Sequence, residues 1–93
     1  MNGLCIQWGC ENGPDNISGK GEYTYKVTMP LAFSSSENYQ VTYSISCSSS
    51  SAGNECQENR TDRTSQKFQV YLYNRNDSTW INNPKLIWLA IGY

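Results

Sequence analysis

Alternating apolar and polar residues run through most of this chain. Such alternation predicts β-strands, because successive side chains of a strand point to opposite faces. Residues 39–47 show it most clearly, with tyrosine, valine, isoleucine and cysteine alternating with glutamine, threonine and serine. Comparable patterns predict strands at residues 4–9, 22–29 and 67–74. Residues 55–64 are polar throughout, and we interpret them as an exposed edge strand whose charges oppose aggregation.

The last predicted strand, residues 86–93, is apolar on both faces. One face carries Leu86, Trp88 and Ala90, and the other carries Ile87, Leu89, Ile91 and Tyr93. Such a strand must be covered twice. Either its own fold covers both faces, or the fold covers one face and a partner chain covers the other.

Six predicted strands joined by turn-rich connections, with no helical period, are typical of an antiparallel β-sandwich. We therefore predict an all-β fold in which residues 1–93 form a single domain, because 93 residues leave little room for a second core. A domain of this size buries only about 60–65% of the surface of its unfolded chain, so association between copies is a common source of further stability.

Composition and charge exclude several classes of function. The formal net charge is −1 and charged residues make up 16% of the chain, so nothing draws it to nucleic acid or to an anionic membrane. No run of about 18 apolar residues occurs, so we expect no membrane insertion. Histidine is absent, which removes the commonest general base and the serine–histidine and cysteine–histidine nucleophile pairs.

Carboxylate pairs are the remaining candidates for catalysis. Glu55 with Glu58, or Asp62 near either, form the plausible pairs. A glycosidase, however, holds its two carboxylates about 5–10 Å apart in a cleft, and this polar segment has no apolar residues to shape one. We interpret all three as surface charges, and predict a protein that is not an enzyme and binds no cofactor.

Four cysteines, Cys5, Cys10, Cys47 and Cys56, leave the thiol state open. Free thiols are our first expectation, and bridges between Cys47 and Cys56 or between Cys5 and Cys10 are the second. Cysteine spacing of the kind that binds zinc does not occur, so we expect no metal site.

Trp80 is the most conspicuous residue of a polar connection, because arginine, asparagine and aspartate surround it in residues 74–84. Protein sites for sugars combine an aromatic ring for the apolar face of a pyranose with amide or carboxylate groups for its hydroxyls. Two interpretations remain open. Trp80 either contacts a glycan or anchors its own loop against the sandwich.

Four segments in order along the chain resemble signatures of the C-terminal domains of bacteriophage tail-fibre proteins. They are residues 6–9 (Ile-Gln-Trp-Gly), residues 25–34, the strand around residues 68–70, and the closing Trp-Leu-Ala-Ile-Gly-Tyr of residues 88–93. The resemblance spans almost the whole chain. The cysteines and the serine-rich residues 48–52 are not part of that pattern.

This resemblance implies a six-stranded sandwich similar to H-type lectins, assembled as a parallel homotrimer at the tip of a fibre. It also implies a virion protein, assembled in the host cytoplasm, that contacts a bacterial surface glycan or other host receptor and joins an upstream fibre shaft. In such a trimer we expect Trp88 and Ala90 in the core and Ile87, Leu89 and Ile91 at the subunit interface. A cellular H-type lectin and a purely structural trimeric cap are the alternatives.

The alternation of strand direction predicts where a receptor would bind. If a shaft enters at the N-terminus, the first, third and fifth connections lie at the end away from it, and these are the longest: residues 10–21, 48–55 and 74–85. Because loops on a rigid scaffold commonly carry binding, we expect them to form the receptor surface. The leading residues are Trp80, Arg75, Asp77, Asn82, Asp15 and Asn54.

Overall fold

Antiparallel strands make up nearly all of the regular structure in the computed structural model, which describes residues 3–48, 54–76 and 79–93. Six of these strands are long, and they are β1 (Cys5–Asn12), β3 (Glu22–Thr28), β4 (Tyr39–Ser46), β5 (Asn54–Glu58), β6 (Lys67–Asn74) and β8 (Lys85–Gly92). Two short strands, β2 (Asn16–Ile17) and β7 (Ile81–Asn82), and a 3-10 turn, η1 (Arg60–Asp62), complete the described part.

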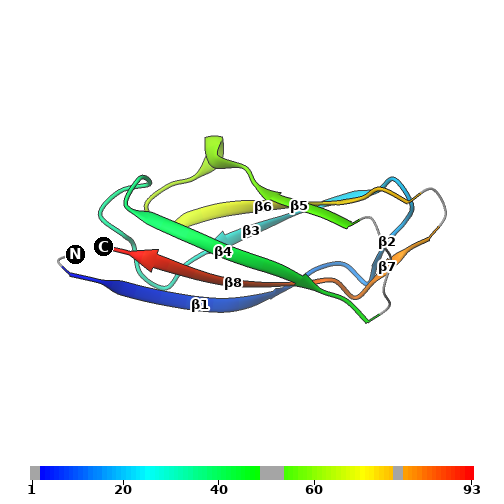
Figure 1. Cartoon of the computed structure of the whole chain (residues 1–93), viewed down its shortest axis with the longest axis horizontal. Helices are drawn as coiled ribbons and strands as arrows, with labels where there is room; N and C mark the ends of the chain where they lie inside the picture. The colour runs from blue at the N-terminus through cyan, green and yellow to red at the C-terminus, as the bar shows by residue number, and fades with distance from the viewer. Residues whose placement is uncertain (1–2, 49–53, 77–78) are drawn as a thin grey trace.

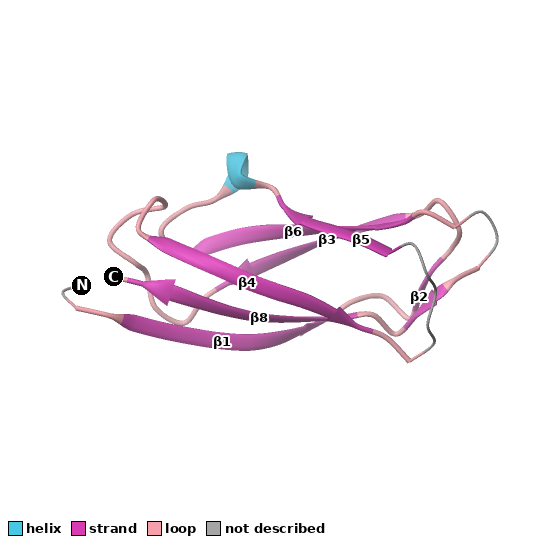
Figure 2. Cartoon of the chain, viewed as in Figure 1, coloured by secondary structure: helices cyan, strands magenta, loops and turns pink. Residues whose placement is uncertain are grey.

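Two three-stranded sheets face each other across a shared interior (Figures 1 and 2). Sheet I has the order β1-β8-β4, and sheet II has the order β3-β6-β5. The pair β2-β7 forms a separate small ribbon at the end of the molecule away from both termini. The result is an elongated body of 48 × 23 × 17 Å.

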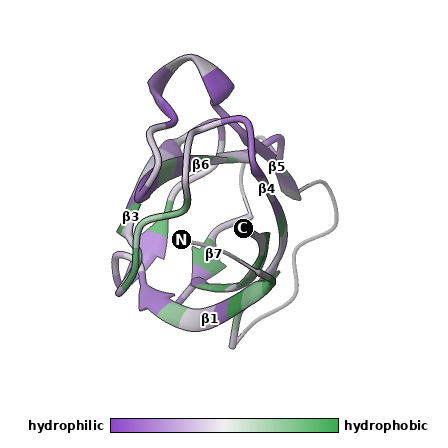
Figure 3. Ribbon diagram, turned by 90° about the vertical axis from the view of Figure 1, so that its left-hand side faces the viewer, coloured by the Kyte–Doolittle hydropathy of each residue, from purple (hydrophilic) through white to green (hydrophobic). Residues whose placement is uncertain are grey.

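The core fills the space between the sheets with alternate residues of each strand. Figure 3, which looks along the body, shows the strands arranged around this interior. Phe68 of β6 meets the indole of Trp88 of β8 edge to face, with ring centroids 5.5 Å apart. Gly9 of β1 makes room for that indole, since a Cβ there would lie 2.7 Å from the Trp88 ring. Buried rings of this kind each contribute roughly 1.5–3 kcal/mol of hydrophobic stabilisation.

The last strand, β8, is the central strand of sheet I. Leu86, Trp88 and Ala90 are buried, which confirms the expected placement of Trp88 and Ala90 in the core. The other face remains exposed in the single chain, with exposed fractions of 47% for Ile87, 41% for Leu89 and 38% for Ile91. The fold therefore covers this strand once.

Residues 55–64 do not form one continuous strand, which corrects the sequence-based expectation. β5 ends at Glu58, and Asn59 then caps η1 by accepting a hydrogen bond from the backbone N–H of Thr61 (3.2 Å). An asparagine in this role satisfies a donor that the first turn leaves unpaired. The expected edge position is confirmed, because among the described strands β5 pairs with β6 alone.

The ends of other strands differ by a few residues from the predicted ones. β1 continues to Asn12 rather than ending at residue 9, and β2 and β7 lie within connections that we expected to be irregular. No helix in the parts of the chain that the structure describes is long and apolar enough to cross a membrane.

Candidate functional site

The described parts of three connections lie at the end of the sandwich opposite the termini, as strand alternation predicted (Figure 1). These connections join β1 to β3, β4 to β5 and β6 to β8. We call this region the loop end. Backbone hydrogen bonds join its parts: Lys20 N–H donates to Asn76 (2.9 Å), and Ser48 N–H donates to Asn82 (3.0 Å). Asn83 N–H donates to the Asp15 carbonyl at 2.7 Å. The described parts of the loop end thus form one connected surface.

Asn74, the last residue of β6, lies beneath this surface and hydrogen-bonds to its loops. Its side chain is fully buried, and its Nδ2 donates to the carbonyls of Thr79 (2.7 Å), Ile17 (3.2 Å) and Ser18 (3.2 Å). Its Oδ1 accepts from the backbone N–H of Asn76 at 3.1 Å. A single amide therefore satisfies backbone groups of two different loops. Sequence analysis missed this residue, since nothing local distinguishes it from the chain's other asparagines.

Pro84 provides a second junction beneath the loop end. Its carbonyl accepts from the Tyr25 hydroxyl and from the Gly13 N–H, each at 2.9 Å. Burial raises the pKa of Tyr25 to about 12, so the phenol stays protonated and keeps donating this hydrogen bond at physiological pH. Gly13 has to be small, because a Cβ there would collide with the Tyr25 hydroxyl and the Pro84 carbonyl.

Trp80 stands half exposed at the loop end, with an exposed fraction of 50%. Its neighbour Ile81 is fully buried, so Ile81 anchors this loop to the core. Trp80 therefore offers an aromatic surface to solvent, as a binding residue requires.

The other predicted site residues have different surroundings. Arg75 is exposed and forms an ion pair with Glu55 at 3.2 Å, and Asp15 is also exposed. Asn82 is half-buried within β7, and Asn54 begins β5 opposite Asn74. Asp77 lies outside the described residues. The structure brings Asp15 and Asn82 to one surface with Trp80, while the binding role of all six stays a prediction.

The outer face of sheet I is a second exposed feature. Cross-strand pairs place Ile6 beside Ile91 and Trp8 beside Leu89, and Trp8 is 73% exposed. On the far side of β8 the outward residues of β4 are polar: Gln40, Thr42 and Ser44. We call the side chains of Ile6, Trp8, Ile87, Leu89 and Ile91 the outer apolar face. The contribution of β1 was absent from the predicted interface, which named only residues of the last strand.

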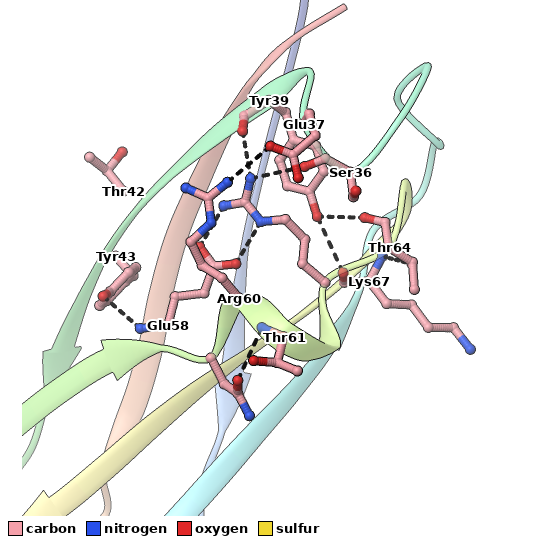
Figure 4. Close-up of polar contacts among 12 residues, drawn as sticks. Ser36, Glu37, Tyr39, Thr42, Tyr43, Glu58, Arg60, Thr61, Thr64 and Lys67 are labelled. Carbon is pink, nitrogen blue, oxygen red and sulfur yellow. Dashed lines mark hydrogen bonds and ion pairs between the residues drawn. The ribbon is translucent and has the colours of Figure 1, made fainter.

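Glu58 is not a surface charge, which corrects the sequence-based interpretation. Its carboxylate binds the Arg63 guanidinium through two contacts, at 2.6 Å from Nε and 2.5 Å from Nη2, and both side chains are at least 90% buried. Arg63 also donates to the Tyr39 carbonyl at 2.7 Å and stacks over the Tyr39 ring at 4.3 Å. Figure 4 shows the polar contacts around the labelled Tyr39 and Glu58. The hydrogen bond with Glu58 raises the pKa of Arg63. This carboxylate is fully engaged in holding the chain together.

The two other carboxylates of that segment remain exposed, as expected. Glu55 faces solvent beside Arg75, and Asp62 accepts a hydrogen bond from the Asn59 amide at 2.9 Å.

All four cysteines are unbridged. Cys56 packs against the core, where burial raises the pKa of its thiol. Among the residues whose placement is described, no three histidine, cysteine, aspartate or glutamate side chains gather closely enough to hold a metal ion.

A protein-family model described as "Putative tail fiber protein gp53-like, C-terminal" matches residues 1–93. The C-terminal part of the P. aeruginosa R1 pyocin fibre has a similar structure, with a TM-score of 0.75 at 20% identity, covering 98% of this chain and 24% of that one. An N-truncated R1-type pyocin tail fibre matches with a TM-score of 0.71, 20% identity, and coverage of 98% and 72%. The chain thus spans about a quarter of the first of these fibre structures. No curated protein sequence matches it.

Proposed function

The chain belongs to the gp53-like C-terminal family of tail fibre proteins, and on that premise we propose that it is the non-enzymatic, receptor-binding tip of a fibre. It recognises a glycan of the host cell surface through the loop end. The sandwich is a rigid support of the H-type-lectin kind, and the connections of the loop end supply the contacts.

The observation that carries this proposal is that the termini and the loop end lie at opposite ends of the molecule. Both termini lie at one end, and the β2-β7 ribbon lies at the other (Figure 1). The half-exposed Trp80 directly precedes β7. A chain that continues into a shaft from its terminal end would present the loop end outward. The ring of Trp80 and the polar groups of Asp15 and Asn82 match what a pyranose needs, an apolar platform with hydrogen-bonding groups at its edge.

The oligomer we propose is a parallel homotrimer in which three copies cover the outer apolar face, with Ile87, Leu89 and Ile91 at the interface. A contiguous exposed apolar patch marks an interaction surface in a soluble protein. A second copy brings the same apolar chemistry to it. Three shallow sugar sites on one rigid tip gain about 10²–10⁴ in apparent affinity over a single site. Trimerisation therefore serves binding as well as stability.

Trp80→Ala tests the binding surface. Labelled wild-type chain is first screened on a glycan array and on a panel of bacterial strains, and the variant is then compared on the surfaces that bind. Loss of binding with an unchanged unfolding midpoint is expected. Leu31→Ala removes another exposed apolar side chain, in the connection after β3, and serves as the matched control. A lower midpoint with binding intact would refute the role of Trp80.

Light scattering tests the oligomer. We expect a trimer mass for the wild type and a monomer mass for Leu89→Asp, since three carboxylates cannot be buried together against apolar neighbours. Thr24→Asp places the same charge on the outer face of sheet II and should leave the mass unchanged. A wild-type monomer would contradict the trimer. A trimer that binds no glycan or cell would instead favour the purely structural cap.

A further inference from the structure

A hollow on the flank of the molecule lies apart from the loop end. Its lining residues come from β5, the start of η1 and β6, and Figures 1 and 3 show η1 rising above the end of β5. Its lining consists of Gln57, Glu58, Asn59, Arg60 and Tyr71. Sheet II is the layer opposite the outer apolar face, so copies that associate through that face leave the hollow open.

Tyr71 forms the aromatic part of this hollow. In the strand register it stands between Thr24 of β3 and Gln57 of β5. Its hydroxyl donates a hydrogen bond to the Glu22 carboxylate, which fixes the direction of the ring and raises the pKa of Tyr71. A half-exposed ring held in one orientation loses little entropy when a ligand stacks on it.

The hollow's polar groups divide into engaged and available ones. Glu58 is bound by Arg63, and Asn59 caps η1 while its amide donates to Asp62. The exposed Gln57 side chain makes no hydrogen bond to any residue that the structure describes. Arg60 is 56% exposed, and its ion pair with the still more exposed Glu37 is long, at 3.6 Å. Gln57 and Arg60 are therefore the groups free to bind a ligand.

The surrounding charge selects an uncharged ligand. Glu22, Glu37 and Asp62 all lie near the hollow or its lining residues. Arg60 is opposed by this excess of carboxylates, so an anionic ligand would meet net repulsion. Hydroxyl groups can instead accept from Arg60 and exchange hydrogen bonds with the Gln57 amide, which is both donor and acceptor.

We propose that this hollow is a second carbohydrate site, for one uncharged pyranose unit whose apolar face stacks on Tyr71 and whose hydroxyls bind Gln57 and Arg60. It would give the fibre a lateral contact with a glycan in addition to the contact at its tip. The site does not depend on the loop end.

An amide-resolved NMR titration of the full 93-residue chain tests the site. The probes are methyl α-glucopyranoside, methyl α-galactopyranoside, N-acetylglucosamine and glucuronic acid. At least one neutral sugar should shift the amide signals of Gln57, Arg60 and Tyr71 with a roughly millimolar Kd, as expected for a small ligand in an open site. Glucuronic acid should shift them much less. No response to any neutral probe, or an equal response to glucuronic acid, overturns the proposal.

Substitutions distinguish the contribution of the Tyr71 ring to binding from effects on folding. Tyr71→Ala should weaken binding about tenfold, whereas Tyr71→Phe keeps the stacking surface and should retain it within about threefold. Arg60→Gln should weaken binding, while Lys26→Gln, the same charge loss on the outer face of sheet II, should not. Signal shifts confined to residues 75–84 would overturn this site and leave the proposed function standing. Shifts confined to the hollow would support this site and would contradict glycan binding at the loop end.

Discussion

Glu58→Gln breaks a buried ion pair while keeping the shape of the side chain. Arg63 would then remain charged with only 3% of its side chain exposed. Removing one partner of such a pair costs about 3–5 kcal/mol, because the other charge stays buried without its counterion. A 93-residue domain loses about 4–8 °C in Tm per kcal/mol, so the midpoint should fall by at least about 12 °C.

Thermal unfolding measures this Tm and urea unfolding measures the free energy of unfolding, both followed by circular dichroism at one fixed protomer concentration. Glu37→Gln is the matched control, because Glu37 is 79% exposed and its contact with Arg60 is 3.6 Å long. An exposed pair of this kind contributes about 0–1 kcal/mol, so this variant should unfold almost as the wild type does.

The double variant Glu58→Leu with Arg63→Met tests the physical reason. It leaves no buried charge, so its destabilisation should be smaller than that of Glu58→Gln alone. It still removes the donor to the Tyr39 carbonyl, which costs about 1–3 kcal/mol when a buried acceptor is left unpaired. If Glu58→Gln stays within about 1 kcal/mol of the wild type, or the double variant is the less stable of the two, the reasoning is wrong.

Three further predictions concern the loop end and the core. Asn74→Ala should lower the free energy of unfolding by about 2–4 kcal/mol, because it leaves several carbonyls unpaired. It should also speed amide hydrogen exchange in both loops that Asn74 joins. Unchanged exchange would contradict this linking role. Because the pKa of Tyr25 rises to about 12 in the folded chain from 10.0, its contribution to stability is complete below pH 10 and is lost as pH rises towards 12. The unfolding midpoint of Tyr25→Phe should therefore fall less over that pH range than the midpoint of the wild type. An equal fall in both proteins would refute the assignment. Gly9→Ala should destabilise by about 1–3 kcal/mol by crowding the Trp88 indole, visible as a changed near-UV spectrum.

Periodicity was sufficient to locate the long strands other than β5, because strand faces are a local property of the sequence. Residues 67–74 were predicted with the bounds that β6 has, and the two apolar faces of β8 were correctly separated into a buried and an exposed set. Strand alternation also placed the three long connections at one end.

The rest depends on contacts between distant residues. Glu58 is buried because it pairs with Arg63, which itself stacks over Tyr39. No local sequence pattern predicts these contacts. The two-residue strands β2 and β7 are too short to show alternation, and they exist because they pair with each other. Asn74 acquires its role only when β6 ends beneath two loops.

The central position of β8 has a consequence for how the domain folds. Sheet I contains no pair of consecutive strands, since its last strand inserts between β1 and β4, whereas β5 and β6 of sheet II are neighbours along the chain. Non-local pairing carries a large loop-closure entropy and forms late. We expect sheet II to nucleate folding and β8 to enter last. The outer apolar face is complete only after that insertion, so in the proposed trimer a chain could join other copies only after β8 is in place.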